Sequence, residues 1–463
     1  MNEDRLEELS AVFITDGLTY KDALKRYKKR RNDLKKQFKG PIILRGVERS
    51  IANSHDWVQL DHLYVQDPVF LYFTGLNQYN CAMVLDSTGK DTLFLDYKNL
   101  DEEFWEGKAI GYEEEKLNDI KLLLGFDEIE PINRLYSSVF ELLSTTELTT
   151  LFTMWYVSEG HKKNKESEFY FSFKQELELK IKEAGFKSFE VLSIDSFTFK
   201  RLKLDDTDVK NMNKAIDITK IAFEDVCKKI KTFETETDIS GYIKGVIHSN
   251  SWLGLSFPPI VASGKNAGIL HYKKNNSVLQ ENSLLLMDFG CRYQSVVSDL
   301  SRTIPVRGKF NPLQRLLYQI VLDAQRLVEE HVAPGVTFHR LNELCWTFIE
   351  NALQVRLLLK GGTMERHYKT RPHNIGHLIG HSVHDGDPFR YYSSQPLEIG
   401  MVLTNEPGLY GTFEMEIDDE FYTETCGIRI EDQLLITKKG CQNLSEHCPK
   451  SVEALENLLA SSD

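Results

Sequence analysis

The sequence has no long hydrophobic run. No stretch approaches the roughly 18 consecutive apolar residues that a membrane-spanning helix needs, so we expect no membrane partner. Four of the first eight residues are acidic, and no apolar segment follows them, so the features of a secretory leader are also missing. These absences predict a soluble, cytoplasmic protein.

Paired cysteines are missing as well. The seven cysteines are scattered and form no C-x-x-C pair, which disfavours a redox motif or a zinc knuckle and favours a reducing compartment. Gly and Pro are ordinary in number, at 28 and 13 residues, and no short tandem repeat is visible. Collagen-like and low-complexity proteins are therefore excluded, and solenoids are disfavoured.

Positive charge is scarce: 56 Lys and Arg face 69 Asp and Glu, which leaves a net charge of −13. Because such a chain repels phosphate backbones, we expect no nucleic-acid partner. The exception is residues 20–39, where ten side chains are basic. Apolar residues recur there at helical spacing, which predicts a solvated amphipathic helix rather than a nucleic-acid or targeting segment.

The 463 residues are enough for two or three domains. Short β-like runs (PIILRG, HLYVQDPVFLYFTGL, CAMVLD, DTLFLDYK) and acidic helical segments predict a first α/β domain over residues 1–197. A long helix capped by Asp205 or Asp206 then opens a second domain over residues 203–463, where strands and helices alternate. The fold class predicted is α/β (α+β).

Two acidic residues, Asp288 and Asp299, lie inside apolar β-like runs separated by a polar turn. If that turn centres near Tyr293 and Gln294, the two carboxylates directly oppose each other on a hairpin. Facing carboxylates repel unless a positive charge lies between them, and a metal ion would supply it. The alternative is that one or both residues merely end a strand.

Histidines and further acids follow downstream. His373, His377, His381 and His384 fall within twelve positions, although the chain has only thirteen histidines. Glu406 and Glu431 each lie in a strand-like apolar context, with an ion pair to Arg429 as the alternative role for Glu431. Two Asp, two Glu and one His suit two divalent ions such as Mn²⁺, Fe²⁺, Co²⁺ or Zn²⁺ rather than a Cys-rich zinc site.

The order and motifs of these residues resemble the pita-bread metallopeptidases, in the branch of Xaa-Pro aminopeptidase (aminopeptidase P) and prolidase. The first half is similar to that branch's N-terminal domain through DPVFLYFTGL and the later Trp105-Glu106-Gly107. The resemblance implies a creatinase/aminopeptidase P-like domain followed by a pita-bread catalytic domain. It also implies a homo-dimer or homo-tetramer acting on short peptides that begin Xaa-Pro.

The resemblance further implies a role for each site residue. The metal ligands would be Asp288, Asp299, His377, Glu406 and Glu431, with Asp299 and Glu431 bridging two ions, most readily Mn²⁺, with Co²⁺, Fe²⁺ or Zn²⁺ as alternatives. Glu406 would also act as general base, and a hydroxide bridging the metals would attack the bond before proline. His271, His373 and His384 would lie on the substrate side, and Arg429 would hold a ligand carboxylate in place.

Several alternatives remain open. In a prolidase, an Arg on a longer loop would bind the dipeptide carboxylate. The short segment 383–403 therefore favours the aminopeptidase, although Arg390 could still bind such a carboxylate. A non-catalytic pita-bread binding protein is disfavoured because all five ligand positions are occupied. Gly380 to His384 lacks the final Gly of a serine nucleophile elbow. Asn374 and His381 depart from the family pattern and affect the expected substrate details.

Overall fold

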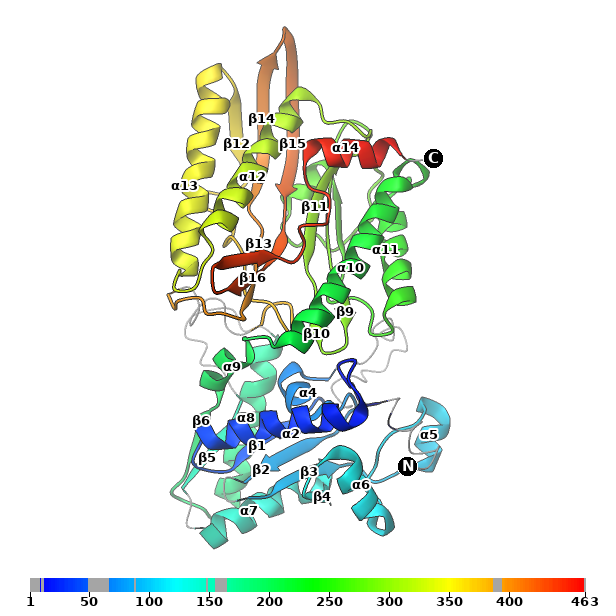
Figure 1. The fold of residues 1–463 in the computed structure, drawn as a ribbon, viewed down its shortest axis with the longest axis vertical. Coiled ribbons are helices and arrows are strands. Elements are labelled where there is room, and N and C mark those ends of the chain that lie inside the picture. Colours follow the sequence, from blue (N-terminus) through cyan, green and yellow to red (C-terminus); the bar gives the residue numbers. More distant parts are fainter. Residues whose placement is uncertain are drawn as a thin grey trace. The chain divides into compact units, whose positions relative to one another are not determined.

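The computed structural model describes residue 9 and residues 12–48, 66–86, 89–146, 149–154, 165–385 and 394–461. The chain divides into two compact units, residues 1–201 and 202–463 (Figure 1). Both units combine helices with sheets, so the α/β class predicted from the sequence is confirmed. Within the described ranges, no helix is long and apolar enough to cross a membrane.

The first unit is built on a six-stranded mixed sheet. Its strands, in spatial order, are β4 (Glu128–Pro131), β3 (Asp91–Leu95), β2 (Ala82–Leu85), β1 (Ile42–Arg45), β5 (Thr150–Thr153) and β6 (Glu190–Ser193). Apolar clusters cover both faces of this sheet. Its helices are α2 (Tyr20–Gln37), α4 (Pro68–Thr74), α5 (Leu100–Glu106), α6 (Leu117–Leu124), α7 (Leu135–Thr146), α8 (Lys165–Glu183) and α9 (Asp195–Arg201).

One segment of the first unit differs from the prediction. The run after Asp67 was expected to be β-like, but residues 68–74 form helix α4. The Asp67 side chain caps this helix by accepting a hydrogen bond from Phe70 N at 2.8 Å, Pro68 occupies its first turn, and Gly75 ends it in the left-handed region at φ 71°. These are standard start and stop signals, and they outweigh the β propensity of the aromatic residues between them.

The basic segment does form the predicted helix, α2, but its basic face is not fully solvated. The Arg31 side chain is buried and donates to Asp91 Oδ2 at 2.8 Å and to the carbonyl oxygen of Phe73 at 3.0 Å. Lys35 forms a second ion pair with Asp91, at 2.5 Å. The prediction is therefore wrong at Arg31, because a buried acid on β3 draws this side chain into the core.

The second unit consists of antiparallel strands and long helices (Figure 1). Its helices are α10 (Asp206–Lys228), α11 (Glu236–Asn250), α12 (Pro312–His331), α13 (Phe338–Arg356) and α14 (Val452–Ala460). Asp205 caps α10, as predicted, by accepting from the N–H groups of Thr207 and Asp208. Short 3₁₀ turns occur in both units, at Glu114–Lys116, Ile132–Arg134, Ile230–Thr232, Gly264–Gly268 and Leu358–Lys360.

Three small sheets and a two-stranded ribbon position the site in this unit. One sheet joins β11 (Leu300–Pro305), β8 (Leu284–Phe289) and β7 (Ile260–Ser263), and the ribbon joins β10 (Val296–Val297) to β9 (Arg292–Tyr293). The second sheet joins β12 (Thr363–Arg366), β14 (Gly408–Ile417) and β15 (Glu420–Arg429). The third joins β13 (Val402–Asn405), β16 (Asp432–Thr437) and β17 (Gly440–Asn443).

Candidate metal centre

Strands β8 and β11 form the predicted hairpin, but its register differs from the prediction. Asp288 lies opposite Ser301, not opposite Asp299. The turn centres on Gln294 and Ser295, one residue later than expected, and Gln294 adopts a positive φ of 54°. A turn displaced by one residue moves every cross-strand partner by two. Asp288 and Asp299 are therefore diagonal neighbours on one face, close enough to interact.

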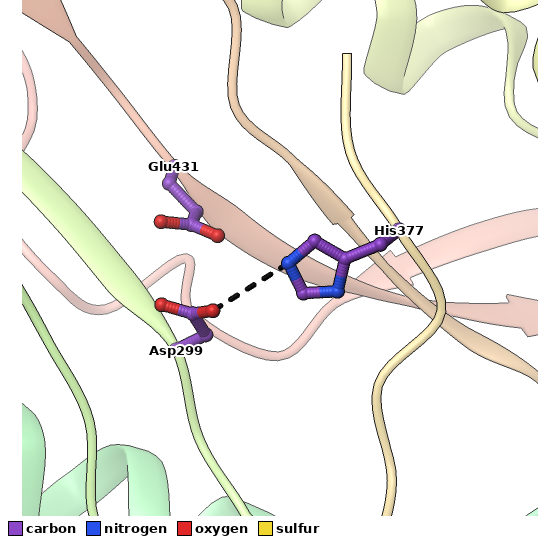
Figure 2. A group of neighbouring side chains, drawn as sticks. All are labelled: Asp299, His377 and Glu431. Atoms are coloured by element: carbon purple, nitrogen blue, oxygen red, sulfur yellow. Dashed lines mark ion pairs between the residues drawn. The ribbon is translucent and has the colours of Figure 1, made fainter. Parts of the chain in front are cut away.

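Three side chains from distant parts of the sequence meet at the end of this hairpin. Ligand atoms of Asp299, His377 and Glu431 all lie within 4.8 Å of one another, and all three residues are buried. Figure 2 shows both carboxylates beside the imidazole, with His377 Nε2 3.6 Å from Asp299 Oδ2. Glu406 joins them, because its Oε1 lies 3.4 Å from His377 Nε2.

Backbone and hydroxyl contacts fix His377 and Glu406 relative to each other. Thr404, at the end of β13, accepts a hydrogen bond from His377 N and donates one to Glu406 Oε1, both at 3.0 Å. His377 Nδ1 lies 3.1 Å from the carbonyl oxygen of Leu378, so this nitrogen carries the proton. The lone pair of Nε2 therefore faces the carboxylates, as a metal ligand requires.

Asp288 and Glu431 are linked by a buried network centred on Arg429. Arg429 Nη2 donates to Asp288 Oδ2 at 2.6 Å, and Arg429 Nε donates to Ser301 Oγ at 2.9 Å. Ser301 in turn donates to Glu431 Oε2 at 2.7 Å. Arg429 thus pairs directly with Asp288, and it reaches Glu431 only through the serine.

The carboxylates carry more negative charge than this single guanidinium balances. Burial, followed by the charges of neighbouring acids, raises the pKa of both Asp299 and Glu431 well above the usual range. Asp288 Oδ1, Asp299 Oδ1 and Glu431 Oε1 are buried oxygens with no hydrogen-bond partner among the described residues. Such oxygens are costly unless a cation meets them. Their position beside one imidazole fits divalent metal ions.

The three histidines predicted to lie on the substrate side, His271, His373 and His384, lie around this centre. His384 packs edge-on against His377, with ring centroids 4.3 Å apart, and burial lowers the pKa of its imidazole to about 4. Part of the His384 side chain is nevertheless open to solvent, so His384 lies at the edge of the site rather than in its interior. Burial also lowers the pKa of His373, and the exposed His271 lies close enough to act electrostatically on both rings.

Sequence reasoning missed three polar residues of the site. Ser301 and Thr404 support the carboxylates, and Tyr410 Oη lies 3.0 Å from both His373 Nε2 and Arg429 Nη1. Ser301 could have been found from the hairpin register, since it faces Asp288. The contacts of Thr404 and Tyr410 with the histidines depend on how the loop that carries His373 and His377 lies against β13 and β14, which spacing does not encode.

The residues that depart from the family pattern lie near the site without joining the carboxylates. His381 is buried and its Nδ1 lies 3.0 Å from the carbonyl oxygen of Ser295, in the hairpin turn. Asn374 is exposed, and its carbonyl oxygen lies 2.6 Å from His373 Nδ1. Arg390, the alternative ligand for a dipeptide carboxylate, lies outside the described residues.

Comparison with known proteins places both units in described families. Residues 210–438 match metallopeptidase family M24, and residues 27–152 match the aminopeptidase P N-terminal domain. The chain is 28% identical over 406 residues to the Xaa-Pro aminopeptidase of Haemophilus influenzae, covering 85% of this chain and 88% of that protein. The aminopeptidase PepP of Pseudomonas aeruginosa superposes with a TM-score of 0.77 at 25% identity, covering 95% of this chain and 98% of that one. A substrate complex of Escherichia coli aminopeptidase P gives a TM-score of 0.76 at the same identity and coverage.

Proposed function

Because this chain belongs to metallopeptidase family M24, in the branch that carries the aminopeptidase P N-terminal domain, we propose that it is a metal-dependent Xaa-Pro aminopeptidase. Such an enzyme releases the first residue of a peptide whose second residue is proline. The observation that carries the proposal is the meeting of unpartnered carboxylate oxygens with His377 in a buried centre. The similar proteins reported above are named Xaa-Pro aminopeptidase, aminopeptidase PepP and aminopeptidase P, and none of the three is named a prolidase.

We propose five metal ligands and two metal ions. The ligands are Asp288, Asp299, His377, Glu406 and Glu431. Two considerations support two ions. The four carboxylates would neutralise the charge of two divalent ions. In addition, Asp299 has one oxygen near His377 and Glu431 has one bonded to Ser301, and each keeps a second oxygen that has no hydrogen-bond partner in the part of the chain that the structure describes. Mn²⁺ is our first choice, because a mostly oxygen ligand set with one imidazole suits it.

The metals, when bound, would supply Lewis acidity toward the scissile carbonyl and lower the pKa of water in the site. The chain itself supplies the proton transfers. Glu406 lies at the edge of the centre, held by Thr404, and its carboxylate would take a proton from the attacking water and return it to the proline nitrogen. That nitrogen belongs to a tertiary amide without an N–H, so it must gain a proton in order to leave.

His384 is suited to hydrogen bonding rather than to carrying charge, whereas both ring nitrogens of His373 are already engaged, by the Asn374 carbonyl oxygen and by Tyr410 Oη. The pKa of His384, near 4, keeps its imidazole neutral at pH 7. A neutral ring N–H at the mouth of the site can donate to the carbonyl oxygen as negative charge develops on it. His271 would be a second donor, since it lies close enough to act electrostatically on both His373 and His384. One such donor is typically worth about 2.7 to 4 kcal/mol in the transition state.

We further propose a cytoplasmic location and a homo-dimer or homo-tetramer. All seven cysteines are free thiols and six are buried, which supports a reducing compartment. Cell fractionation and light scattering test these two points. A membrane-bound or disulfide-linked protein would contradict the first, and a strictly monomeric protein the second.

The experiment for the proposed function uses Mn²⁺-loaded protein and three kinds of peptide. We expect release of the first residue from Xaa-Pro-Yaa peptides and none from Xaa-Ala-Yaa peptides. Cleavage of Xaa-Pro dipeptides alone would identify a prolidase instead. Glu406→Gln is expected to abolish turnover, whereas the matched control Glu424→Gln, at a buried carboxyl outside the centre, should retain it. An inactive wild-type protein that binds metal would point to a non-catalytic binding protein.

A further inference from the structure

A buried acid outside the metal centre has an unusual set of partners. Glu236, the first residue of α11, is fully buried, and the described part of the chain offers it no ion pair. Its carboxylate instead accepts four hydrogen bonds. The donors are Ser263 N at 2.8 Å and Asn266 Nδ2 at 2.9 Å to Oε1, and Tyr272 Oη and Ser277 N, both at 2.9 Å, to Oε2.

All four donors belong to residues 263–277, the segment that leaves β7 and carries His271. The neighbouring backbone is tied to the same place: Glu236 N donates to the carbonyl oxygen of Ser277 at 2.9 Å, and Thr237 Oγ1 donates to that of Asn275 at 2.7 Å. One carboxylate therefore joins the start, middle and end of this segment to the N-terminus of α11.

The contact closest to the site is that of Tyr272, which follows His271 directly in the sequence. The ring of Tyr272 is buried in an apolar cluster that includes Tyr410, whose hydroxyl contacts His373. Its own hydroxyl is held by Glu236. Because packing holds the ring of Tyr272 and a hydrogen bond holds its hydroxyl, the backbone of the adjacent His271 is held as well. The His271 side chain itself is exposed.

The energetics favour a role beyond packing. A buried carboxylate without a cation is costly, and it is tolerated here because four donors and the positive end of the α11 dipole meet it. Glutamine is a sharp probe of this arrangement. Whichever oxygen the amide nitrogen replaces, it faces the backbone N–H of either Ser263 or Ser277. A donor would then oppose a donor, and the segment would lose at least one anchor.

We propose that Glu236 is a positioning residue that holds His271 at the substrate side of the metal centre. The proposal rests on the proposed peptidase function for its kinetic consequence, but its structural consequence is independent of activity. Loosening the segment should spread His271 over several positions, and a donor that is aligned for only part of the time stabilises the transition state less.

The test is a double-mutant cycle between Glu236→Gln and His271→Ala, with Tyr272→Phe as a second, milder removal of one anchor. In the wild-type background, Glu236→Gln should lower kcat/KM for an Xaa-Pro-Yaa peptide about tenfold, mainly through kcat, as expected for one lost hydrogen bond to a charged group. In the His271→Ala background, the same change should cost less than about twofold. Metal content per chain should stay unchanged.

Hydrogen exchange supplies the readout that does not require activity. Amides of residues 264–278 should exchange faster in Glu236→Gln and Tyr272→Phe, and at the wild-type rate in the control Glu424→Gln. Equal losses of kcat/KM in both His271 backgrounds, or unchanged exchange in the segment, would overturn the proposal. If the wild-type protein cleaves no Xaa-Pro peptide, the proposed function fails, and the exchange result still decides whether Glu236 anchors the segment.

Discussion

Replacing Asp299 by Asn is expected to change the stability of the second unit in opposite directions with and without divalent metal. Asp299 and Glu431 offer buried carboxylate oxygens within 4.8 Å of each other. Two full charges at that separation repel by about 3.5 kcal/mol at an effective dielectric constant of 20. In the metal-free protein, the raised pKa of both groups lets a bound proton relieve this repulsion.

Without metal, Asp299→Asn therefore removes an unfavourable charge, and its unfolding temperature should equal or exceed that of the wild type. With metal bound, the wild-type protein becomes more stable toward unfolding. A ligand present at 100 times its dissociation constant stabilises a protein by about 2.7 kcal/mol. For a unit of this size, that gain raises the unfolding temperature by roughly 5 to 11 °C. The variant lacks one ligand oxygen and its charge, so its metal-induced rise should be much smaller.

Differential scanning calorimetry with EDTA or with Mn²⁺ measures both effects, and elemental analysis gives the metal content per chain. Asp217→Asn is the matched control, since Asp217 is half exposed on α10 and pairs with His447. It should show the full wild-type rise. Asp299 is not a metal ligand of this centre if Asp299→Asn lowers the unfolding temperature of the metal-free protein by several degrees, or if it retains the whole metal-induced rise.

Two predictions concern stability away from the centre. Burial raises the pKa of Glu424 from 4.5 to about 7, so its carboxyl group keeps a proton in the folded state that it loses in the unfolded state. The stability that this difference contributes should be complete below pH 4.5 and should fall by about 3 kcal/mol as the pH rises through 7. Denaturant titrations across this range should show the fall in the wild type but not in Glu424→Gln; equal slopes would contradict the assignment. Arg31→Met should destabilise the first unit by about 3 to 5 kcal/mol, because it removes one partner of the buried Asp91. Unchanged urea unfolding would show that Lys35 alone compensates Asp91.

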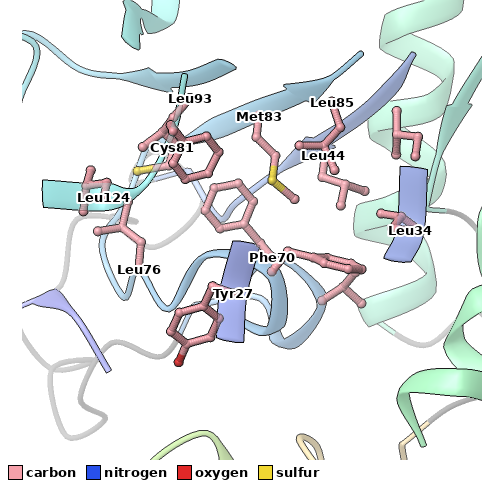
Figure 3. Packing of buried hydrophobic residues seen from close by; sticks show 14 of the residues in the cluster. Tyr27, Leu34, Leu44, Phe70, Leu76, Cys81, Met83, Leu85, Leu93 and Leu124 are labelled. Atoms are coloured by element: carbon pink, nitrogen blue, oxygen red, sulfur yellow. The ribbon is translucent and has the colours of Figure 1, made fainter. Parts of the chain in front are cut away.

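The sequence predicted elements best where local signals agree. The capped start of α10 and the strands of the β8–β11 hairpin follow directly from polar caps and apolar runs. Helix α4 shows the limit of this reasoning. Phe70 is fully buried and belongs with Tyr27 and Met83 to one apolar cluster (Figure 3). A short helix buried in this way has no polar face, so its sequence resembles a buried strand.

Within the site, residue types and order could be read from the sequence, but their geometry could not. A one-residue error in the hairpin turn placed Asp299 opposite Asp288, and only the register shows that Ser301 stands there. The link from Arg429 through Ser301 to Glu431 crosses two sheets. The four contacts of Glu236 likewise depend on a loop folding back on a helix, and no spacing rule encodes that.

The most direct test of the central claim is the time course of first-residue release from one Xaa-Pro-Yaa peptide by a single preparation, before and after chelation. We expect turnover with Mn²⁺, its loss with EDTA, and its return when about two equivalents of metal per chain are added back. Turnover that survives complete removal of metal would show that the reaction does not depend on metal. A metal-loaded protein with all five ligands intact that releases nothing from any Xaa-Pro peptide would contradict the proposed function.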